Sequence, residues 1–250
     1  MNFTTIRCTF IGFAVATLLP ASQLTLDFMH GAPPPSVANI TPLGAAAVNF
    51  ASGQMNITET KSGDGARVAL NDFQAMCVVL DNVSFQNFAF GDGLKFFVYD
   101  DLITGEGIGL ELFQANSITV KVMQNNPDGT NKILQKIDVP NANLGDIGRL
   151  RLDWIKAGTP GGPEQVQAEV IGKRGLSFVS QRVDTDLVHK RLPNGLTVVD
   201  MTGLSLQADP TFSVGDMVFD DEHVPEPSSI SLFTLPAVLL VMSKLLFRRS

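Results

Sequence analysis

The chain is poor in cysteine, histidine, tryptophan and tyrosine. Its 250 residues include two cysteines, three histidines, one tryptophan and one tyrosine. We expect Cys8 to be removed with an N-terminal leader, which leaves Cys77 alone and excludes an intramolecular disulfide. Cys77 lies in the apolar stretch from Phe73 to Leu80, where a cysteine packs as a small hydrophobic residue and its thiolate is suppressed.

Positive charge is also scarce. Charged residues make up 17% of the chain and the formal net charge is −7, with no stripe of lysine or arginine. A protein that neutralises phosphates needs such a stripe, so nucleic acid is excluded as a partner. No histidine has a second histidine or a cysteine at metal-ligand spacing, and neither a Gly-x-Ser-x-Gly elbow nor a P-loop is present.

Paired catalytic carboxylates are missing as well. Enzymes that cleave β-glucans on jelly-roll folds, which the body of this chain is shown below to resemble, carry a Glu-x-Asp-x-Glu or Glu-x-Asp-x-x-Glu strand that supplies the acid and the nucleophile. Six glutamates precede the C-terminal tail motif and none has this spacing: Glu59, Glu106, Glu111, Glu164, Glu169 and Glu222. We therefore expect a protein that is not an enzyme.

The body of the chain, from Leu24 to about Asp221, has an apolar period of two. Ile118, Val120 and Val122 alternate with polar residues, and so do Leu150, Leu152 and Trp154. Such alternation predicts strands with one buried and one wet face. Further strands are predicted at 24–28, 46–50, 55–58, 73–80, 85–90, 94–100, 108–113, 133–139, 165–170, 177–183, 196–200, 204–208 and 213–219. About a dozen short strands without an amphipathic helix predict an all-β, antiparallel, two-sheet jelly-roll sandwich over residues 24–222.

The N-terminus has the layout of a secretory signal peptide. Arg7 supplies a positive charge, an apolar run follows from Cys8 to Leu19, and the small residues Ala21 and Ser22 come after Pro20. We expect a signal peptide over residues 1–22, with an earlier cleavage option at Ala14-Val15-Ala16. The apolar run is too short to span a bilayer, which needs about 20 residues.

The C-terminus ends in an apolar segment with flanking signals. Val224 and Pro225-Glu226-Pro227 precede an apolar stretch of 18 residues from Ile230 to Phe247, and Arg248-Arg249 follow it. As a helix this stretch would be about 27 Å long, enough for a hydrocarbon core, and the arginine pair favours a cytoplasmic end. A plain membrane anchor is the alternative to a removable sorting signal.

This tail, residues 224–250, resembles the PEP-CTERM sorting signal of Gram-negative bacteria. The resemblance rests on Pro225, Glu226, Pro227, the apolar helix at 230–247, Arg248 and Arg249. It implies processing by an exosortase, a transient or lasting membrane anchor, and delivery to the cell surface or extracellular space. Proteins of this family are associated with biofilm and extracellular polysaccharide.

The body resembles concanavalin A-like and laminin G-like jelly rolls. The stretch Gly91-Asp-Gly-Leu-Lys-Phe-Phe-Val-Tyr-Asp100 and the later Gly148-Arg-Leu-Arg-Leu-Asp-Trp154 carry the resemblance. It implies a lectin-like sandwich that binds or organises polysaccharide. The alternative is a passive structural or adhesive module with no sugar ligand.

Two kinds of site remain candidates. Jelly-roll domains often bind calcium through loop carboxylates, and Asp92, Asp100 and Asp101 flank one predicted strand. Asp128 and Asp146 lie in later loops, although aspartate also favours turns for local reasons. Tyr99 and Trp154 could stack on a sugar, but Trp154 is in phase with Leu150 and Leu152 and is expected in the core. The ligand-binding residues stay unassigned.

Overall fold

The computed structural model describes residues 23–71, 73–101, 105–157, 162–188, 197–204 and 209–221. The side chains of Asp100 and Asp101 are not among the described groups. Within these ranges the regular structure is β-strand apart from one short 3-10 helix, η1 (Leu144–Asp146). The predicted signal peptide (1–22) and the predicted sorting tail (224–250) lie outside the described residues. In the described part of the chain, no helix combines the length and apolar character needed to cross a membrane.

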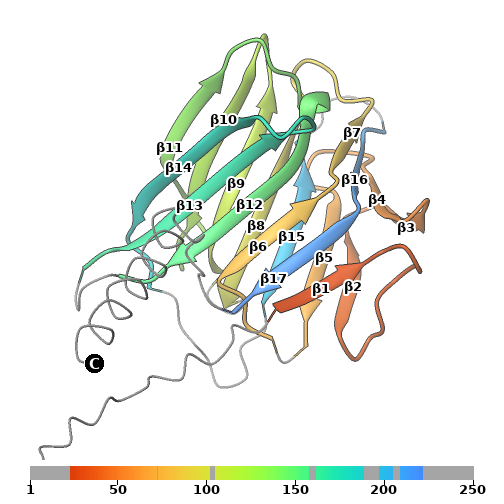
Figure 1. Ribbon diagram of the computed structural model, residues 1–250, viewed down its shortest axis with the longest axis horizontal. Helices are drawn as coiled ribbons and strands as arrows, with labels where there is room; N and C mark the ends of the chain where they lie inside the picture. The colour runs from red at the N-terminus through yellow and green to blue at the C-terminus, as the bar shows by residue number, and fades with distance from the viewer. Residues whose placement is uncertain are drawn as a thin grey trace, which may run out of the picture.

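Two large antiparallel sheets face each other (Figure 1). The first has six strands in the order β1 (Gln23–Asp27), β17 (Asp216–Asp220), β6 (Cys77–Asp81), β12 (Ile147–Ile155), β13 (Glu164–Gly172) and β14 (Ser177–Thr185). The second has seven, in the order β11 (Asn131–Val139), β10 (Ile118–Asn125), β9 (Glu106–Gln114), β8 (Gly93–Asp101), β15 (Val198–Gly203), β5 (Gly65–Leu70) and β2 (Ala38–Leu43). The predicted all-β antiparallel sandwich is therefore confirmed.

A third, smaller sheet extends the six-stranded one. Its four short strands are β3 (Ala47–Ala51), β4 (Gln54–Thr58), β16 (Thr211–Val214) and β7 (Ser84–Gln86), in that order. The chain passes from β6 towards β7 at Asn82 and from β16 to β17 at Gly215. These two bends lie next to each other, where the six-stranded sheet meets the small sheet. Asn82 has a φ of 51°, and its Cβ lies 2.8 Å from where a side chain on Gly215 would begin. Only glycine at 215 leaves room for these two bends to pack together.

One core fills the space between the sheets. Alternate residues of each strand point inward, such as Leu150, Leu152 and Trp154 on β12 and Phe96 and Val98 on β8, and all are buried. They belong to a single hydrophobic cluster that also receives residues from the small sheet. The period-two pattern of the sequence is thus the packing pattern of the core.

The structure corrects several predicted strands. Strands β2 and β5 are absent from the predicted set, because β2 contains Pro42 and β5 begins at Gly65, in the stretch Gly63-Asp64-Gly65 that has the composition of a turn. Pro42 is tolerated because β2 is an edge strand, which does not need every N–H group for pairing. The predicted strand 85–90 is shortened to Ser84–Gln86, and 213–219 is divided at Gly215. Residues 205–208 of another predicted strand lie outside the described residues.

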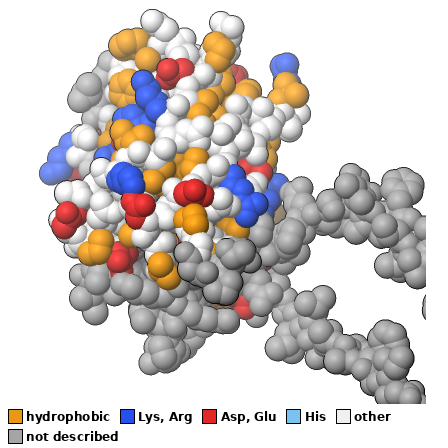
Figure 2. Space-filling model, turned by 90° about the vertical axis from the view of Figure 1, so that its left-hand side faces the viewer, with side chains coloured by type: hydrophobic (Ala, Val, Ile, Leu, Met, Phe, Trp, Pro, Cys, Tyr) orange, Lys and Arg blue, Asp and Glu red, His pale blue; other side chains and the backbone are white. Residues whose placement is uncertain are grey.

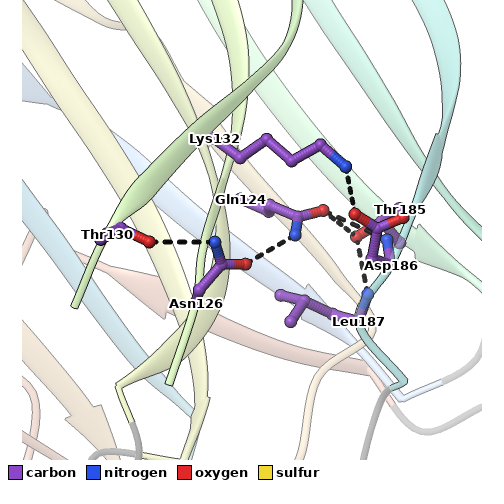
Figure 3. A network of polar contacts seen from close by, with 7 residues as sticks. All are labelled: Gln124, Asn126, Thr130, Lys132, Thr185, Asp186 and Leu187. Atoms are coloured by element: carbon purple, nitrogen blue, oxygen red, sulfur yellow. Dashed lines mark hydrogen bonds and ion pairs between the residues drawn. The ribbon is translucent and has the colours of Figure 1, made fainter. Parts of the chain in front are cut away.

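A polar network joins the two large sheets along one open side (Figure 3). Buried Gln124 on β10 accepts hydrogen bonds from the Thr185 hydroxyl (2.9 Å) and the Asp186 N–H (3.2 Å) at the end of β14. Its amide nitrogen donates to Asn126 Oδ1 (2.7 Å), and Lys132 on β11 forms an ion pair with Asp186. Each buried polar atom of Gln124 therefore has a partner, and edge strands β11 and β14 are held together without a covalent link.

We predict that replacing Gln124 with leucine lowers the free energy of unfolding by about 2 to 4 kcal/mol. The Thr185 hydroxyl and the Asp186 N–H would lose their acceptor in a buried position, at about 1 to 3 kcal/mol for each unsatisfied group. Urea unfolding followed by tryptophan fluorescence measures the change. The matched control is Lys132→Gln, which removes an exposed ion pair and should cost less than about 1 kcal/mol. Equal stability of the two variants would contradict the role given to Gln124.

Candidate functional site

Three connecting segments, one of which contains η1, lie next to one another at one end of the sandwich. They are the loop before β8, the turn between β9 and β10, and η1 with the residue before it. Together with Phe85 of β7 they line an open cavity of about 480 Å³, which we call the aromatic pocket. It is lined by Phe85, Asn87, Phe88, Ala89, Phe90, Gln114, Ala115, Asn143, Leu144 and Gly145.

Gln114 and Asp92 fix the shape of this pocket. The Gln114 side chain accepts the N–H of Leu144 (2.7 Å) and donates to the carbonyl of Ala115 (3.0 Å), which ties η1 to the β9–β10 turn. The Asp92 carboxylate accepts the N–H of Ala89 (2.7 Å), which pins the loop before β8. Both side chains are buried, so the pocket walls are built in advance of any ligand.

The pocket combines aromatic faces with amide groups. The ring of Phe85 lies edge-on to Phe88, with ring centroids 5.2 Å apart, and its centroid is 5.1 Å from that of Phe212 in the core, whereas residue Phe90 is 67% exposed. Asn87 and Asn143 are exposed at the rim. Aromatic rings contact the C–H face of a sugar, and amides donate to and accept from its hydroxyl groups. A site of this composition suits an uncharged polyhydroxylated ligand.

The outer face of the seven-stranded sheet carries a second group of aromatic residues. Phe97 and Tyr99 on β8 lie nearly parallel, with ring centroids 5.9 Å apart and an angle of 20°. They lie against two glycines of β9: a Cβ on Gly109 would be 2.6 Å from the Phe97 ring, and one on Gly107 would be 2.9 Å from the Tyr99 ring. Phe97 is nevertheless buried, and it offers less surface to a ligand than Phe90.

Carboxylates on this outer face are neutralised by cations. Arg67 binds Asp200 through two hydrogen bonds of 2.7 and 2.6 Å, and Glu111 lies between Lys95 and Lys121. Glycoside hydrolysis needs one carboxylic acid that holds its proton near neutral pH. Asp200 and Glu111 are each held in ion pairs, so neither offers an unpaired carboxylic acid for that role. Acidic and basic side chains are also interspersed on the face shown in Figure 2, without a continuous patch of one sign.

The three aspartates predicted to bind calcium do not come together. Asp92 directly precedes β8 and Asp101 is its last residue, so a strand of nine residues, roughly 30 Å long, separates them. Asp100 is adjacent to Asp101 in this strand. The sorting-motif residues Pro225, Glu226, Pro227, Arg248 and Arg249 lie outside the described residues.

Trp154 and Cys77 are both buried, as predicted, but in different surroundings. The Trp154 ring belongs to the core and its indole N–H donates to Glu164 at 2.6 Å, so it is not a sugar-stacking platform. Cys77 pairs across the sheet with Asp153 and Asp220 and lies on the side opposite Val78 and Leu80, outside the core cluster. Burial first, and then the charge of Asp153, raise the pKa of the Cys77 thiol far above its usual value.

Sequence reasoning missed a buried acidic group made of Glu59, Asp64 and Asp92, all with 0% exposure. Glu59 follows β4 in phase with buried Met55 and Ile57, and this phase was the signal that could have revealed its inward direction. Both of its carboxyl oxygens lack a hydrogen-bond partner. Burial, with the charges of Asp92 and then Asp64, raises the pKa of Glu59 from 4.5 to about 8.

Asp64 differs from Glu59 because it is saturated with donors. Its carboxylate accepts the Thr60 hydroxyl (2.5 Å) and the N–H groups of Ala45 (2.9 Å), Thr60 (3.2 Å) and Lys61 (3.1 Å). These bonds, the Thr60 hydroxyl first, lower the pKa of Asp64 and keep it ionised. A fixed negative charge therefore stands close to Glu59.

Comparison with known proteins shows the fold. A phage protein module, "the CBM2 module of Lactobacillus casei BL23 phage J-1 evolved Dit", aligns with a TM-score of 0.55 and 11% identity over 83% of this chain and 100% of its own. Lectin I from Ulex europaeus, solved with the methyl glycoside of α-L-fucose, aligns with a TM-score of 0.53 and 13% identity, covering 79% of this chain and 97% of its own.

A third structure aligns with a similar score. It was solved in work on endo-acting O-glycanases of the human gut microbiota and has a TM-score of 0.52 and 10% identity over 79% of this chain and 98% of its own. No protein-family model and no curated protein matches the sequence. At these identities the structural likeness establishes a lectin-like β-sandwich, a fold that occurs in binding proteins and in glycoside hydrolases.

We predict that Glu59 makes the stability of the protein pH-dependent in metal-free buffer. The folded state holds the Glu59 proton up to about pH 8, whereas the unfolded state loses it near pH 4.5. The folded state therefore binds more protons in this window, and stability falls by up to roughly 1.4 kcal/mol per pH unit as the pH rises from 4.5 to 8. Urea unfolding of wild type and Glu59→Gln at several pH values measures the difference, which should grow with pH. A constant difference would contradict the assignment.

Proposed function

We propose that this chain is an exported bacterial surface protein that binds extracellular polysaccharide through the aromatic pocket. The observation that carries the proposal is the pocket itself: an exposed phenylalanine and two exposed amides around a cavity of about 480 Å³, on a lectin-like sandwich. The Ulex lectin was solved with a fucoside, which supports a sugar as the ligand class for this fold. The choice of saccharide is set by the Asn87 amide and by the amide N–H donors of Asn143, whose Oδ1 already accepts from Gln114 Nε2 at 3.5 Å.

The protein acts as a binding module, without catalysis. The sequence has no glycosidase spacing of carboxylates, and Glu111 and Asp200 on the outer face of the seven-stranded sheet are neutralised by lysine and arginine. The aromatic pocket has no carboxylate among its lining residues. A paired acid and nucleophile, which retaining and inverting glycosidases both need, is therefore lacking at the proposed site.

Export and sorting rest on the residue patterns of the two ends. Residues 1–22 have the layout of a signal peptide, and residues 224–250 have that of a sorting signal read by an exosortase. The folded body would be delivered to the cell surface or the surrounding matrix of a Gram-negative bacterium. Removal of the tail would leave the mature protein without the apolar segment at 230–247.

Glycan binding by the purified protein should depend on Phe90. On a glycan array we expect binding to at least one saccharide, and Phe90→Ala should weaken it about five- to tenfold because the exposed ring supplies stacking worth about 1 to 1.4 kcal/mol. The matched control is Ile133→Ala, which removes an exposed apolar side chain on edge strand β11, outside the pocket. An array without any bound glycan would favour the passive surface module instead.

Processing of the tail is expected to require Glu226. In the native bacterium, mass spectrometry should find a mature C-terminus near Pro225-Glu226-Pro227, and Glu226→Ala should retain the tail. Arg249→Lys, which keeps the terminal positive charge, is the control and should be processed normally. An intact C-terminus at Ser250 in the wild type would reject the sorting proposal.

A further inference from the structure

Within the buried acidic group, the Glu59 carboxyl group needs either a proton or a bound cation in the folded protein. Asp64 is held ionised by four hydrogen bonds, and Glu59 stands beside it with both carboxyl oxygens unpartnered and no exposure to solvent. No ion pair described in the structure reaches Glu59 or Asp64, and the nearby Lys61 is exposed. Buried carboxylates of native proteins are ordinarily paired, protonated or bound to a cation.

We propose that Glu59 and Asp92 bind a divalent cation of the calcium type at the junction of the seven-stranded sheet and the small sheet. Carboxylate oxygens are hard ligands, and two of them beside the fixed charge of Asp64 provide the negative potential that retains such an ion. Asp64 contributes charge and is not a ligand, because four donors already occupy its oxygens. The cation would satisfy the oxygens that protein donors leave unpartnered on Glu59.

The local backbone is adapted to the position of the Glu59 carboxyl group. This group lies directly over Gly203, the last residue of β15, where a Cβ would come within 1.4 Å of Oε2. Any larger residue at 203 would displace the carboxyl group. The close approach places Glu59 against the ends of β15 and β8, where Leu204 N–H bonds to the carbonyl of Gly93 (2.8 Å).

The rest of the coordination shell would come from backbone carbonyls and water. Among the described residues, no three histidine, cysteine, aspartate or glutamate side chains are grouped to hold an ion. Calcium accepts such mixed shells, because it takes six to eight oxygen ligands in flexible geometry and carbonyl oxygens are among them. Magnesium, which demands a near-ideal octahedron, fits this arrangement less well.

The site has a structural connection to the aromatic pocket. Asp92, the second proposed ligand, accepts the Ala89 N–H and so fixes the loop that carries Phe88 and Phe90. A cation bound to Asp92 would stiffen this loop while relieving the repulsion with Glu59. The cation site is independent of the identity of any saccharide.

Calcium titration of the purified protein tests the proposal. Isothermal titration calorimetry should show one calcium ion bound per chain, and calcium at ten times the Kd should raise the midpoint of thermal unfolding by about 3 to 6 °C. Glu59→Gln should abolish both effects and should be at least as stable as the wild type in metal-free buffer. Asp92→Asn, which keeps an acceptor for the Ala89 N–H, should weaken binding at least tenfold and serves as the second variant.

The control variant is Asp138→Asn, which removes an exposed carboxylate on β11 and should respond to calcium as the wild type does. Absence of calcium binding by the wild type up to about 10 mM would overturn the proposal, since extracellular calcium modules bind at about 0.1 to 1 mM. A calcium response that persists unchanged in both Glu59→Gln and Asp92→Asn would also overturn it.

Discussion

The burial of one face of each large sheet against the other is the constraint on which the whole structure depends. No disulfide can form between Cys77 and a second cysteine of the body, so packing and hydrogen bonds hold the described sandwich together. Every strand therefore has to keep its apolar residues in one phase, as Leu150, Leu152 and Trp154 do on β12. A slip of one residue would turn this set outward.

The polar side chains that share the inward phase are the informative exceptions. Gln124 is buried and fully partnered, and its bonds close one side of the sandwich. Glu59 is buried and unpartnered, in the same alternation as Met55 and Ile57. A buried polar side chain with all its hydrogen bonds made, such as Gln124, helps to specify one structure. A buried polar side chain without hydrogen bonds, such as Glu59, indicates a missing partner, which here is a proton or a cation. The contrast separates a structural network from a candidate binding site.

The period of the sequence was sufficient to predict the fold class, because alternation reports directly on the burial of strand faces. It was insufficient for β2 and β5, because Pro42 and Gly65 are residues typical of turns. It also did not predict the separate small sheet, which arises from bends at Asn82 and Gly215. The candidate site was less predictable. The aromatic pocket is lined by Phe90, the β9–β10 turn and η1, which are far apart in sequence, so no local sequence motif predicts it.

The proposed saccharide site is the pocket of phenylalanine and asparagine side chains beside η1, and not the outer face of the seven-stranded sheet. The most direct measurement is an NMR titration with oligosaccharides cut from the producing bacterium's own matrix polysaccharide. The account predicts that the side-chain amide signals of Asn87 and Asn143 shift with saccharide concentration. Shifts confined to residues around Phe97 and Tyr99, or no shifts at all, would contradict it.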